Sequence, residues 1–476
     1  MASAAKKHNY ERQVDTKERL AFYVSSFFRD MSYALIGGYL TLFYIDIMGF
    51  AGTAALIVIP IITRLWDGVN DPLLGAYFDK RSYGKEKARP IFKSTSIVVA
   101  VLIVLMFYAP KFSENPYTDY VIKSIYAVIT YIILEAMHTL NGTAFMSLYN
   151  SISENPDERT EIISIARLFS TAGTGVVGGL VPILLGFFRN DDVVAKTYIY
   201  LGVACFVAVA FLIYNALMYR FVHERGIVPP PEKQKILPMF KRFAQNKLIL
   251  LIILSSCISN FINYGTIQLY FYTYNMGSPS LQTIFYIFTI PSFLLGTFLV
   301  PKLTKRFNKR DLMIACYLVM ALANGLFLFA GYKPPVWVVL TVLFLNNIPV
   351  CIKGVLYWSM VADSVDYGEW KTGYRNDGLI YAIEGCASKI IGSVGAIFTG
   401  VVISAINYIP NAAYQTESTM KGLFYIPQIV IVVTSLLSVI PFLFYDLDRK
   451  KHEKILGELK QRKSAAQLQG EEMHQS

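Results

Sequence analysis

Long apolar segments recur along the whole chain and are separated by short polar and charged stretches. A transmembrane α-helix needs about 20 mostly apolar residues to cross about 30 Å of hydrocarbon. Window hydropathy places about twelve such segments, at residues 19–48, 51–78, 91–110, 118–150, 161–188, 196–222, 248–275, 280–301, 311–331, 335–362, 377–406 and 420–445. The pattern predicts an all-α membrane protein with twelve transmembrane helices.

The basic residues between these segments gather in alternate loops. The dense runs lie at residues 80–89, 220–242, 302–310 and 449–454, whereas the intervening loops carry scattered cations such as Lys111, Arg189, Lys333 and Lys421. Cytoplasmic loops of membrane proteins are enriched in Lys and Arg. We therefore expect both termini in the cytoplasm and a multi-pass protein of the cell (plasma) membrane.

A linker with three consecutive prolines divides the apolar pattern into near-equal halves. It covers residues 223–247, and the basic loops at 79–85 and 302–310 follow the second and the eighth span. The sequence predicts six-helix bundles at 1–222 and 248–446, the cytoplasmic linker 223–247 and a cytoplasmic tail at 447–476. This duplication resembles major facilitator carriers, whose binding cavity lies between the halves.

Composition agrees with a multi-span protein and excludes several other classes. The 476 residues are 54% hydrophobic, and the mean hydropathy is +0.43, above the value of an ordinary soluble domain. The net charge of +11 resides in loops, so no nucleic-acid partner is expected. The five cysteines occur singly in apolar segments, and the N-terminus lacks the apolar core of a signal peptide. Since no phosphate loop, zinc-ligand pair or nucleophile elbow is present, we expect neither an enzyme nor a cofactor.

Two carboxylates lie one helical turn apart in the second apolar segment. Asp67 and Asp71 share one face of a helix. An acid at bilayer depth costs about 2.5–3.5 kcal/mol on insertion scales. We therefore expect a chain that keeps two of them to use them on an ion or substrate path. The competing interpretation is a structural charge cluster in which the acids pair with Arg64 and Lys389.

Two motifs resemble those of one transporter family. The first is Arg64-Leu65-Trp66-Asp67-Gly68-Val69-Asn70-Asp71-Pro72-Leu73-Leu74-Gly75, with Asp79 and Gly84-Lys85 after it, and the second is the run from Ala362 to Arg375. Both are similar to motifs of the melibiose carrier family, the glycoside-pentoside-hexuronide cation symporters. The similarity runs nearly end to end.

The resemblance implies roles for individual residues. It implies that Asp30, beside Arg29, contacts the sugar, that Arg167 lies near the sugar, and that Thr139 and Lys389 join Asp67 and Asp71 at the cation site. Neighbouring helix positions are about 100 degrees apart, so one of Arg29 and Asp30 is expected to serve the fold. For Arg167 the alternative is an interfacial side chain that reaches toward water.

The fourth span departs from the melibiose carriers. Gly142 stands at the position of their second sugar-binding aspartate, Asn141 is one residue out of register, Met146 replaces a tryptophan and His138 a tyrosine. The resemblance therefore does not extend to melibiose itself, although these positions stay candidates for substrate binding. His138 is interpreted as a hydrogen-bonded cavity residue rather than a proton relay.

Two charged residues and a group of glycines complete the candidates. Glu384 in the eleventh span is a further acceptor for substrate hydroxyls. Lys353 in the tenth span is assigned with equal weight to an anionic substrate or to packing and ion pairing. We expect the fifth-span glycines to permit close helix contact; they are Gly173, Gly175, Gly178 and Gly179.

These observations predict a cation-coupled secondary symporter that imports a sugar or glycoside by alternating access. The coupling cation is Na⁺ or H⁺, because carboxylates serve both, and for sodium the metal ligands are Asp67 and Asp71. No protein partner is expected. One alternative is a cation-coupled lysophospholipid carrier of the same fold, and another is a sugar sensor that does not transport.

Overall fold

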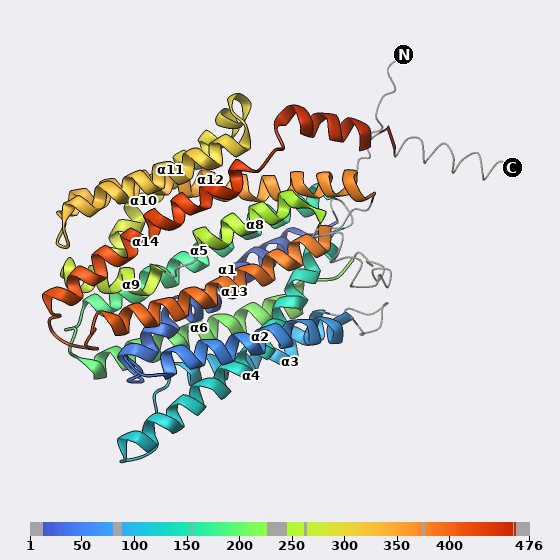
Figure 1. The fold of residues 1–476 in the computed structure, drawn as a ribbon. Coiled ribbons are helices and arrows are strands. Elements are labelled where there is room, and N and C mark those ends of the chain that lie inside the picture. The colour runs from blue at the N-terminus through green and yellow to red at the C-terminus, as the bar shows by residue number, and fades with distance from the viewer. Residues whose placement is uncertain are drawn as a thin grey trace. The chain divides into compact units, whose positions relative to one another are not determined.

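The described part of the chain is helical throughout. The computed structural model describes residues 13–79, 88–153, 156–225, 245–260, 264–373, 377–459 and 461–462, and within them no β-strand occurs. The helices (Figure 1) are α1 Thr16–Asp46, α2 Ala55–Asp79, α3 Ala88–Met106, α4 Pro116–Ser151, α5 Pro156–Gly186, α6 Val193–Phe221, α8 Lys247–Ser259, α9 Tyr264–Tyr270, η1 Phe271–Asn275, α10 Leu281–Arg306, α11 Lys309–Phe327, η2 Leu328–Ala330, α12 Val336–Thr372, α13 Asp377–Ala405 and α14 Glu417–Leu443.

The helices follow the predicted apolar segments closely, and the prediction of an all-α membrane protein is confirmed. Eight described helices are long and apolar enough to cross a membrane. Taken together, α8, α9 and η1 form the seventh of twelve spans. The tenth span is longer than predicted, because α12 continues to Thr372, past the apolar segment that ends at residue 362.

Contacts between α-carbons divide the chain into two units. Unit 1 contains residues 1–231 and 408–413, and unit 2 contains residues 232–407 and 414–476. Within unit 1, α2 pairs with α4 and α3 with α6; within unit 2, α10 pairs with α12 and α11 with α14. Each pairing in unit 2 lies six spans after its equivalent in unit 1, as expected of a duplicated six-helix unit.

The short segment 408–413, between α13 and α14 in the sequence, is held in unit 1 by polar contacts. The Tyr408 hydroxyl donates to Asp46 Oδ1 over 3.3 Å, and the Asn411 amide donates to the Asp46 carbonyl. Lys196 Nζ donates to Asn411 Oδ1 over 2.8 Å. The end of α1 and the start of α6 therefore bind a loop that belongs, by sequence, to the second half of the chain.

The segment after α14, expected to be a tail, packs back onto α12. It contains a further helix, drawn in red beyond α14 in Figure 1. His452 Nε2 lies 3.3 Å from Asp366 Oδ2, and Trp370 Nε1 donates to Glu458 Oε2 over 2.6 Å. Ile455 is buried in the apolar core of unit 2. Asp366 and Trp370, two residues of the motif that begins at Ala362, therefore anchor the C-terminal helix.

A close backbone approach joins α1 and α5 at Gly173. A β-carbon built on Gly173 would lie only 2.1 Å from the carbonyl oxygen of Phe27 on α1. Gly175 and Gly178, which were expected to have the same role, face open space. The tightest approach is therefore at Gly173, whereas at Gly178 the contact with α1 is a hydrogen bond from the Tyr39 hydroxyl to the Gly178 carbonyl over 2.8 Å.

The matched pair Gly173→Ala and Gly175→Ala tests this approach. Gly173→Ala forces apart two backbones that cannot yield, so it is expected to destabilise the protein by about 1–3 kcal/mol. Gly175→Ala only gains helix propensity, about 0.5–1 kcal/mol. Apparent unfolding midpoints in detergent measure both variants. Equal midpoints for the two would contradict the packing described here.

A buried carboxylate ties the start of α5 to the start of α1. Glu158 accepts hydrogen bonds from the Arg19 guanidinium, from Ser153 Oγ over 2.6 Å and from the backbone N–H groups of Gln13 and Val14. Burial alone raises the pKa of Glu158, but these hydrogen bonds together outweigh it and lower the pKa below its ordinary value. The carboxylate is therefore stabilised in its ionised form.

The contribution of Glu158 is expected to depend on pH. A carboxyl group whose pKa falls on folding stabilises the protein above its unfolded pKa, and the contribution disappears as pH falls through the folded value. Glu158→Gln should lower the unfolding midpoint at pH 7, with a loss of about 3–5 kcal/mol, and the difference from wild type should shrink toward pH 4. The control is Glu161→Gln, because Glu161 is 47% exposed and lies 3.7 Å from Arg19. A Glu158→Gln deficit that stays constant between pH 7 and pH 4 would be incompatible with the assignment.

Candidate functional site

Arg29 and Asp30 on α1 contact each other although they are sequence neighbours. Arg29 Nη1 donates to Asp30 Oδ1 over 3.0 Å, and the Asp30 side chain is 24% exposed against 10% for Arg29. The guanidinium carbon lies 4.7 Å from the ring centroid of Tyr33 and 4.4 Å from that of Phe145. The long arginine side chain spans the angle between the two positions, so Arg29 is held by aromatic rings while Asp30 is the more open acceptor.

A stacked pair of rings lies beside this ion pair. The rings of Tyr33 and His138 are 4.1 Å apart between centroids, and His138 Nε2 lies 3.1 Å from Ser32 Oγ. A β-carbon on Gly142 would approach the Tyr33 hydroxyl to 3.0 Å and Arg29 Nη2 to 3.9 Å. The absence of a side chain at Gly142 therefore leaves the room that Tyr33 and Arg29 occupy.

Asp71 on α2 contacts α4, and Asp67 lies one helical turn away. Asp67 is 3% exposed and Asp71 is half-buried. Thr139 Oγ1 donates to Asp71 Oδ1 over 3.1 Å, which joins the second and fourth spans. Among the residues that the structure describes, no group of three or more His, Cys, Asp or Glu side chains could hold a metal ion. The printed contact therefore joins one carboxylate of α2 and one hydroxyl of α4.

Sequence reasoning missed one acid of the same span. Glu135 is half-buried on α4, one helical turn before Thr139, and its charge acts on the Tyr33 hydroxyl together with those of Arg29 and Asp30. The signal that could have found it is the one that selected Asp67, an ionisable side chain within an apolar segment. It adds a carboxylate to the face of α4 that carries Thr139.

Asn141 lies in a different environment from the other candidates on α4. It is 1% exposed, its amide nitrogen donates to Thr95 Oγ1 over 2.8 Å and to Asn215 Oδ1 over 2.7 Å, and its oxygen accepts from the Tyr214 hydroxyl over 2.8 Å. These partners come from α3 and α6. The structure therefore places Asn141 in a saturated interhelical network rather than beside Asp30.

The remaining candidates have no printed contact with this group among the described residues. Met146 is 48% exposed and Arg167 on α5 is also exposed, at the surface of unit 1. Glu384 and Lys389 belong to α13, but their side chains lie outside the described residues. The structure thus brings together Arg29, Asp30 and His138 on one hand and Asp71 and Thr139 on the other.

Unit 2 contains a polar cavity of about 360 Å³. Lys353 on α12 lines it, and its Nζ donates to Ser259 Oγ at the end of α8 over 2.8 Å and lies 5.3 Å from the ring centroid of Tyr317. Amide and hydroxyl side chains make up much of the remaining wall; they include Asn260, Gln268, Asn324, Asn346 and Gln428. Burial of an ammonium group in such a cavity is costly unless a ligand or a counter-charge compensates it.

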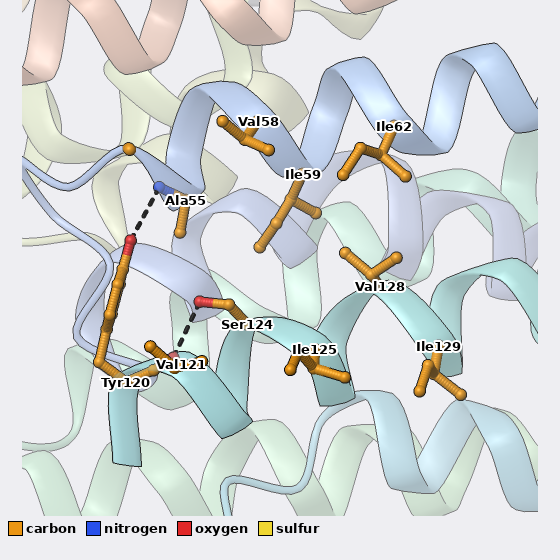
Figure 2. Close-up of a pocket in the computed structure, with 11 residues that line it drawn as sticks. Ala55, Val58, Ile59, Ile62, Tyr120, Val121, Ser124, Ile125, Val128 and Ile129 are labelled. Atoms are coloured by element: carbon orange, nitrogen blue, oxygen red, sulfur yellow. Dashed lines mark hydrogen bonds between the residues drawn. The ribbon is translucent and has the colours of Figure 1, made fainter. Parts of the chain in front are cut away.

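An apolar groove of about 360 Å³ lies between the first turns of α2 and α4. Figure 2 shows isoleucine and valine side chains of both helices facing it, with the Tyr120 hydroxyl accepting a 3.2 Å hydrogen bond from the Ala55 backbone. Ser124 and Tyr120 supply its few polar atoms, and both are engaged within the walls. The groove therefore has the character of a lipid-contacting surface, not of a sugar site.

Residues 22–449 match the family described as MFS/sugar transport protein. The chain belongs to this family. The predicted resemblance to the glycoside-pentoside-hexuronide symporters is confirmed by relatives that extend nearly end to end.

The isoprimeverose transporter of Lactiplantibacillus pentosus is 27% identical to this chain, and the match covers 95% of this chain and 93% of the transporter. The uncharacterized symporter YnaJ of Bacillus subtilis is 26% identical, and the match covers 95% of this chain and 96% of YnaJ. A proposed sulfoquinovose importer of Escherichia coli is also 26% identical, and the match covers 95% of each chain.

Solved structures show the same fold at lower sequence identity. The D-xylose-proton symporter aligns with a TM-score of 0.63 at 14% identity, covering 91% of this chain and 98% of that chain. A bacterial homologue of the lysosomal transporter Spinster aligns with a TM-score of 0.65 at 14% identity, with 94% and 99% covered. This member of the MFS/sugar transport family is therefore a multi-pass secondary transporter and not an enzyme.

The space above Gly142 is expected to matter for ligand binding rather than for folding. In Gly142→Ala the new methyl group presses on the Tyr33 hydroxyl, and because Tyr33 is 38% exposed it can shift at a cost below about 1.5 kcal/mol. The unfolding midpoint should stay near that of wild type while substrate affinity falls about three- to tenfold. Titration of sugar uptake measures this, with Gly175→Ala as control. Unchanged affinity in Gly142→Ala would show that the substrate does not use the space beside Tyr33 and Arg29.

Proposed function

We propose that this protein is a symporter that couples the uptake of a sugar or glycoside to the entry of Na⁺ or H⁺ across the cell membrane, with both termini in the cytoplasm. The observation that carries the proposal is the Asp71–Thr139 contact, because it presents a carboxylate and a hydroxyl together inside the helical bundle of unit 1. Asp67, one helical turn away, supplies a second carboxylate. Oxygen ligands of this kind bind sodium, and a carboxylate alone takes up a proton.

The sugar is assigned to the group on α1 and α4. Sugar hydroxyls donate to a carboxylate and accept from a guanidinium, and hydrogen bonds of this charged kind are about twice as strong as neutral ones. The partly open Asp30, held by Arg29, offers both, with the Tyr33–His138 stack beside it. The relatives named as sugar and glycoside transporters support a carbohydrate as the substrate.

A lysophospholipid is the second candidate substrate, and the apolar groove between α2 and α4 is the observation that favours it. The walls of that groove contain no charged side chain for a phosphate headgroup among the residues lining it. Uptake assays that include lysophosphatidylcholine beside a panel of glycosides, pentosides and uronides separate the two candidates.

Asp71 and Thr139 are expected to govern cation coupling. In proteoliposomes, Asp71→Asn should abolish uphill accumulation of sugar under an inward Na⁺ or H⁺ gradient while sugar exchange continues. Thr139→Val removes a hydrogen bond to a charged group, worth about 1.5–3 kcal/mol, and should raise the half-saturating cation concentration at least tenfold. Thr139→Ser keeps the hydroxyl and serves as the matched control.

The same assay identifies the ion by replacing sodium at fixed pH or by collapsing the pH gradient. The proposal for the cation site fails if Asp71→Asn accumulates sugar as well as wild type does. It also fails if Thr139→Val and Thr139→Ser have the same cation dependence.

A further inference from the structure

A second cavity of unit 2, also of about 360 Å³, lies where α10 ends and α11 begins. The segment that follows α14 supplies the rest of its wall, including the first turn of the C-terminal helix, which begins at Arg449. The basic runs at 302–310 and 449–454, far apart in the sequence, therefore meet at one site. This cavity shares no lining residue with the cavity that contains Lys353.

The last turns of α10 present three cations on one face. Lys302, Lys305 and Arg306 are spaced three and four residues apart, so their side chains are neighbours on the helix. All three are exposed, and none forms an ion pair within the described part of the chain. Lys305 lines the cavity. Since like charges at this spacing destabilise a helix, an anion bound here relieves their repulsion.

Two acids of the wall are engaged by other partners. Asp363 Oδ2 lies 2.6 Å from Lys309 Nζ, and Asp363 Oδ1 lies 3.9 Å from His452 Nδ1. Asp448 accepts a hydrogen bond of 2.8 Å from the backbone N–H of Lys451. These carboxylates therefore do not neutralise the cations of α10.

The third acid of the wall forms a weaker pair. Glu453 lies 2.9 Å from Arg449 Nε, and the two side chains are 61% and 66% exposed. An exposed pair of this kind contributes little to stability, whereas a guanidinium group forms strong paired hydrogen bonds with a phosphate. Arg449 is thus available to a phosphate that enters beside Lys305.

A buried tyrosine on the wall has an unused hydroxyl. Tyr445 lines the cavity, is 1% exposed and packs its ring into the apolar core of unit 2. Its hydroxyl makes no hydrogen bond within the part of the chain that the structure describes. Buried polar groups are almost always hydrogen-bonded, and a phenol O–H is a donor, so this one calls for an oxygen acceptor in the cavity.

Apolar side chains surround the same end of unit 2. Phe307 lines the cavity and is 54% exposed, and Leu443 and Phe444 at the end of α14 are 56% and 60% exposed. Aromatic residues are enriched where hydrocarbon gives way to headgroups. The cavity therefore lies at the level of the lipid headgroups, with apolar surface beside it for acyl chains.

We propose that this cavity binds the headgroup phosphate of an anionic phospholipid, with Lys305 and Arg449 beside its charge and the Tyr445 hydroxyl donating to one of its oxygens. Basic pockets at the ends of membrane helices hold anionic headgroups in this way. The acyl chains lie against Phe307 and Phe444. The ligand is a lipid of the surrounding membrane and not the transported substrate, so the inference goes beyond the proposed function and does not depend on it.

The test is native mass spectrometry of the full chain released from detergent micelles, with no sugar and no ion gradient. Dioleoylphosphatidylglycerol and dioleoylphosphatidylcholine have the same acyl chains and differ in net charge. Wild type should bind phosphatidylglycerol about tenfold or more tightly, because the choline group adds a cation beside Lys305 and Arg449. A third arm adds inorganic phosphate, which should not displace phosphatidylglycerol.

Three variants locate the binding. Lys305→Gln should weaken phosphatidylglycerol about fivefold, because it removes one cation from the headgroup. Tyr445→Phe keeps the ring in the core and should weaken it about tenfold through the lost hydrogen bond to a charged group. Lys450→Gln is the matched control, since it removes the same charge from an exposed neighbour of Arg449 that does not line the cavity. Its affinity should stay near that of wild type.

Several outcomes would overturn the lipid site. One is equal affinity of wild type for the two phospholipids, and another is wild-type affinity in both Lys305→Gln and Tyr445→Phe. A loss in Lys450→Gln as large as that in Lys305→Gln would show that binding follows surface charge and not the cavity. Displacement by inorganic phosphate would assign the cavity to free phosphate instead of a lipid. Because no sugar is present, none of these results bears on symport, and a failure of sugar uptake leaves the lipid site standing.

Discussion

Negative charge inside an apolar helix is the constraint on which the rest of unit 1 depends. A carboxylate at bilayer depth costs about 2.5–3.5 kcal/mol, and α2 contains two of them within one turn. The cost is reduced only where oxygen, hydroxyl or cationic groups replace water around the acid. Thr139 does so for Asp71, and the pairing of α2 with α4 that this requires is one of the main helix contacts of the unit. On α4, His138 and Gly142 lie beside Tyr33 and Arg29 of α1.

Polar side chains in the protein fall into two kinds, and the difference separates structure from function. Asn141 donates from its amide nitrogen to Thr95 and Asn215 and accepts from Tyr214, so it joins α4 to α3 and α6. Asp30 accepts from Arg29 and its side chain is 24% exposed, and Lys353 donates to Ser259 on the wall of the unit 2 cavity. Saturated networks rigidify a bundle, whereas groups with unused capacity mark the places where a substrate completes the hydrogen bonding.

The sequence predicted the spans well because hydropathy and helix length are imposed by the bilayer, not by tertiary detail. It also selected Asp71 and Thr139, which the structure brings into contact, from motifs that resemble a known family. It could not predict that the Asn141 amide bonds within the helical bundle, since its partners Thr95 and Asn215 lie 46 and 74 positions away in the sequence. Nor could spacing show that Gly173 touches Phe27 while Gly175 does not, because helix rotation within a bundle is set by packing. Spacing also does not show that the segment after α14 packs on α12, because its apolar residues, such as Ile455, are few and its partners lie on another helix.

The net charge that crosses the membrane with the substrate decides how much the membrane potential contributes to uptake. A neutral sugar entering with one cation carries one positive charge, and the membrane potential then contributes about 2.3 kcal/mol per 100 mV. A singly charged anionic sugar with one cation crosses with no net charge, so the potential contributes nothing and the cation gradient acts alone. Electrogenic uptake of an anion therefore requires at least two cations, and hence more than one carboxylate able to receive them. Under the proposed function, Asp67 and Asp71 on α2, with Glu135 one turn from Thr139 on α4, are the candidate acids for more than one cation. By linkage, a bound cation that raises the affinity for the substrate must have its own affinity raised by the same factor.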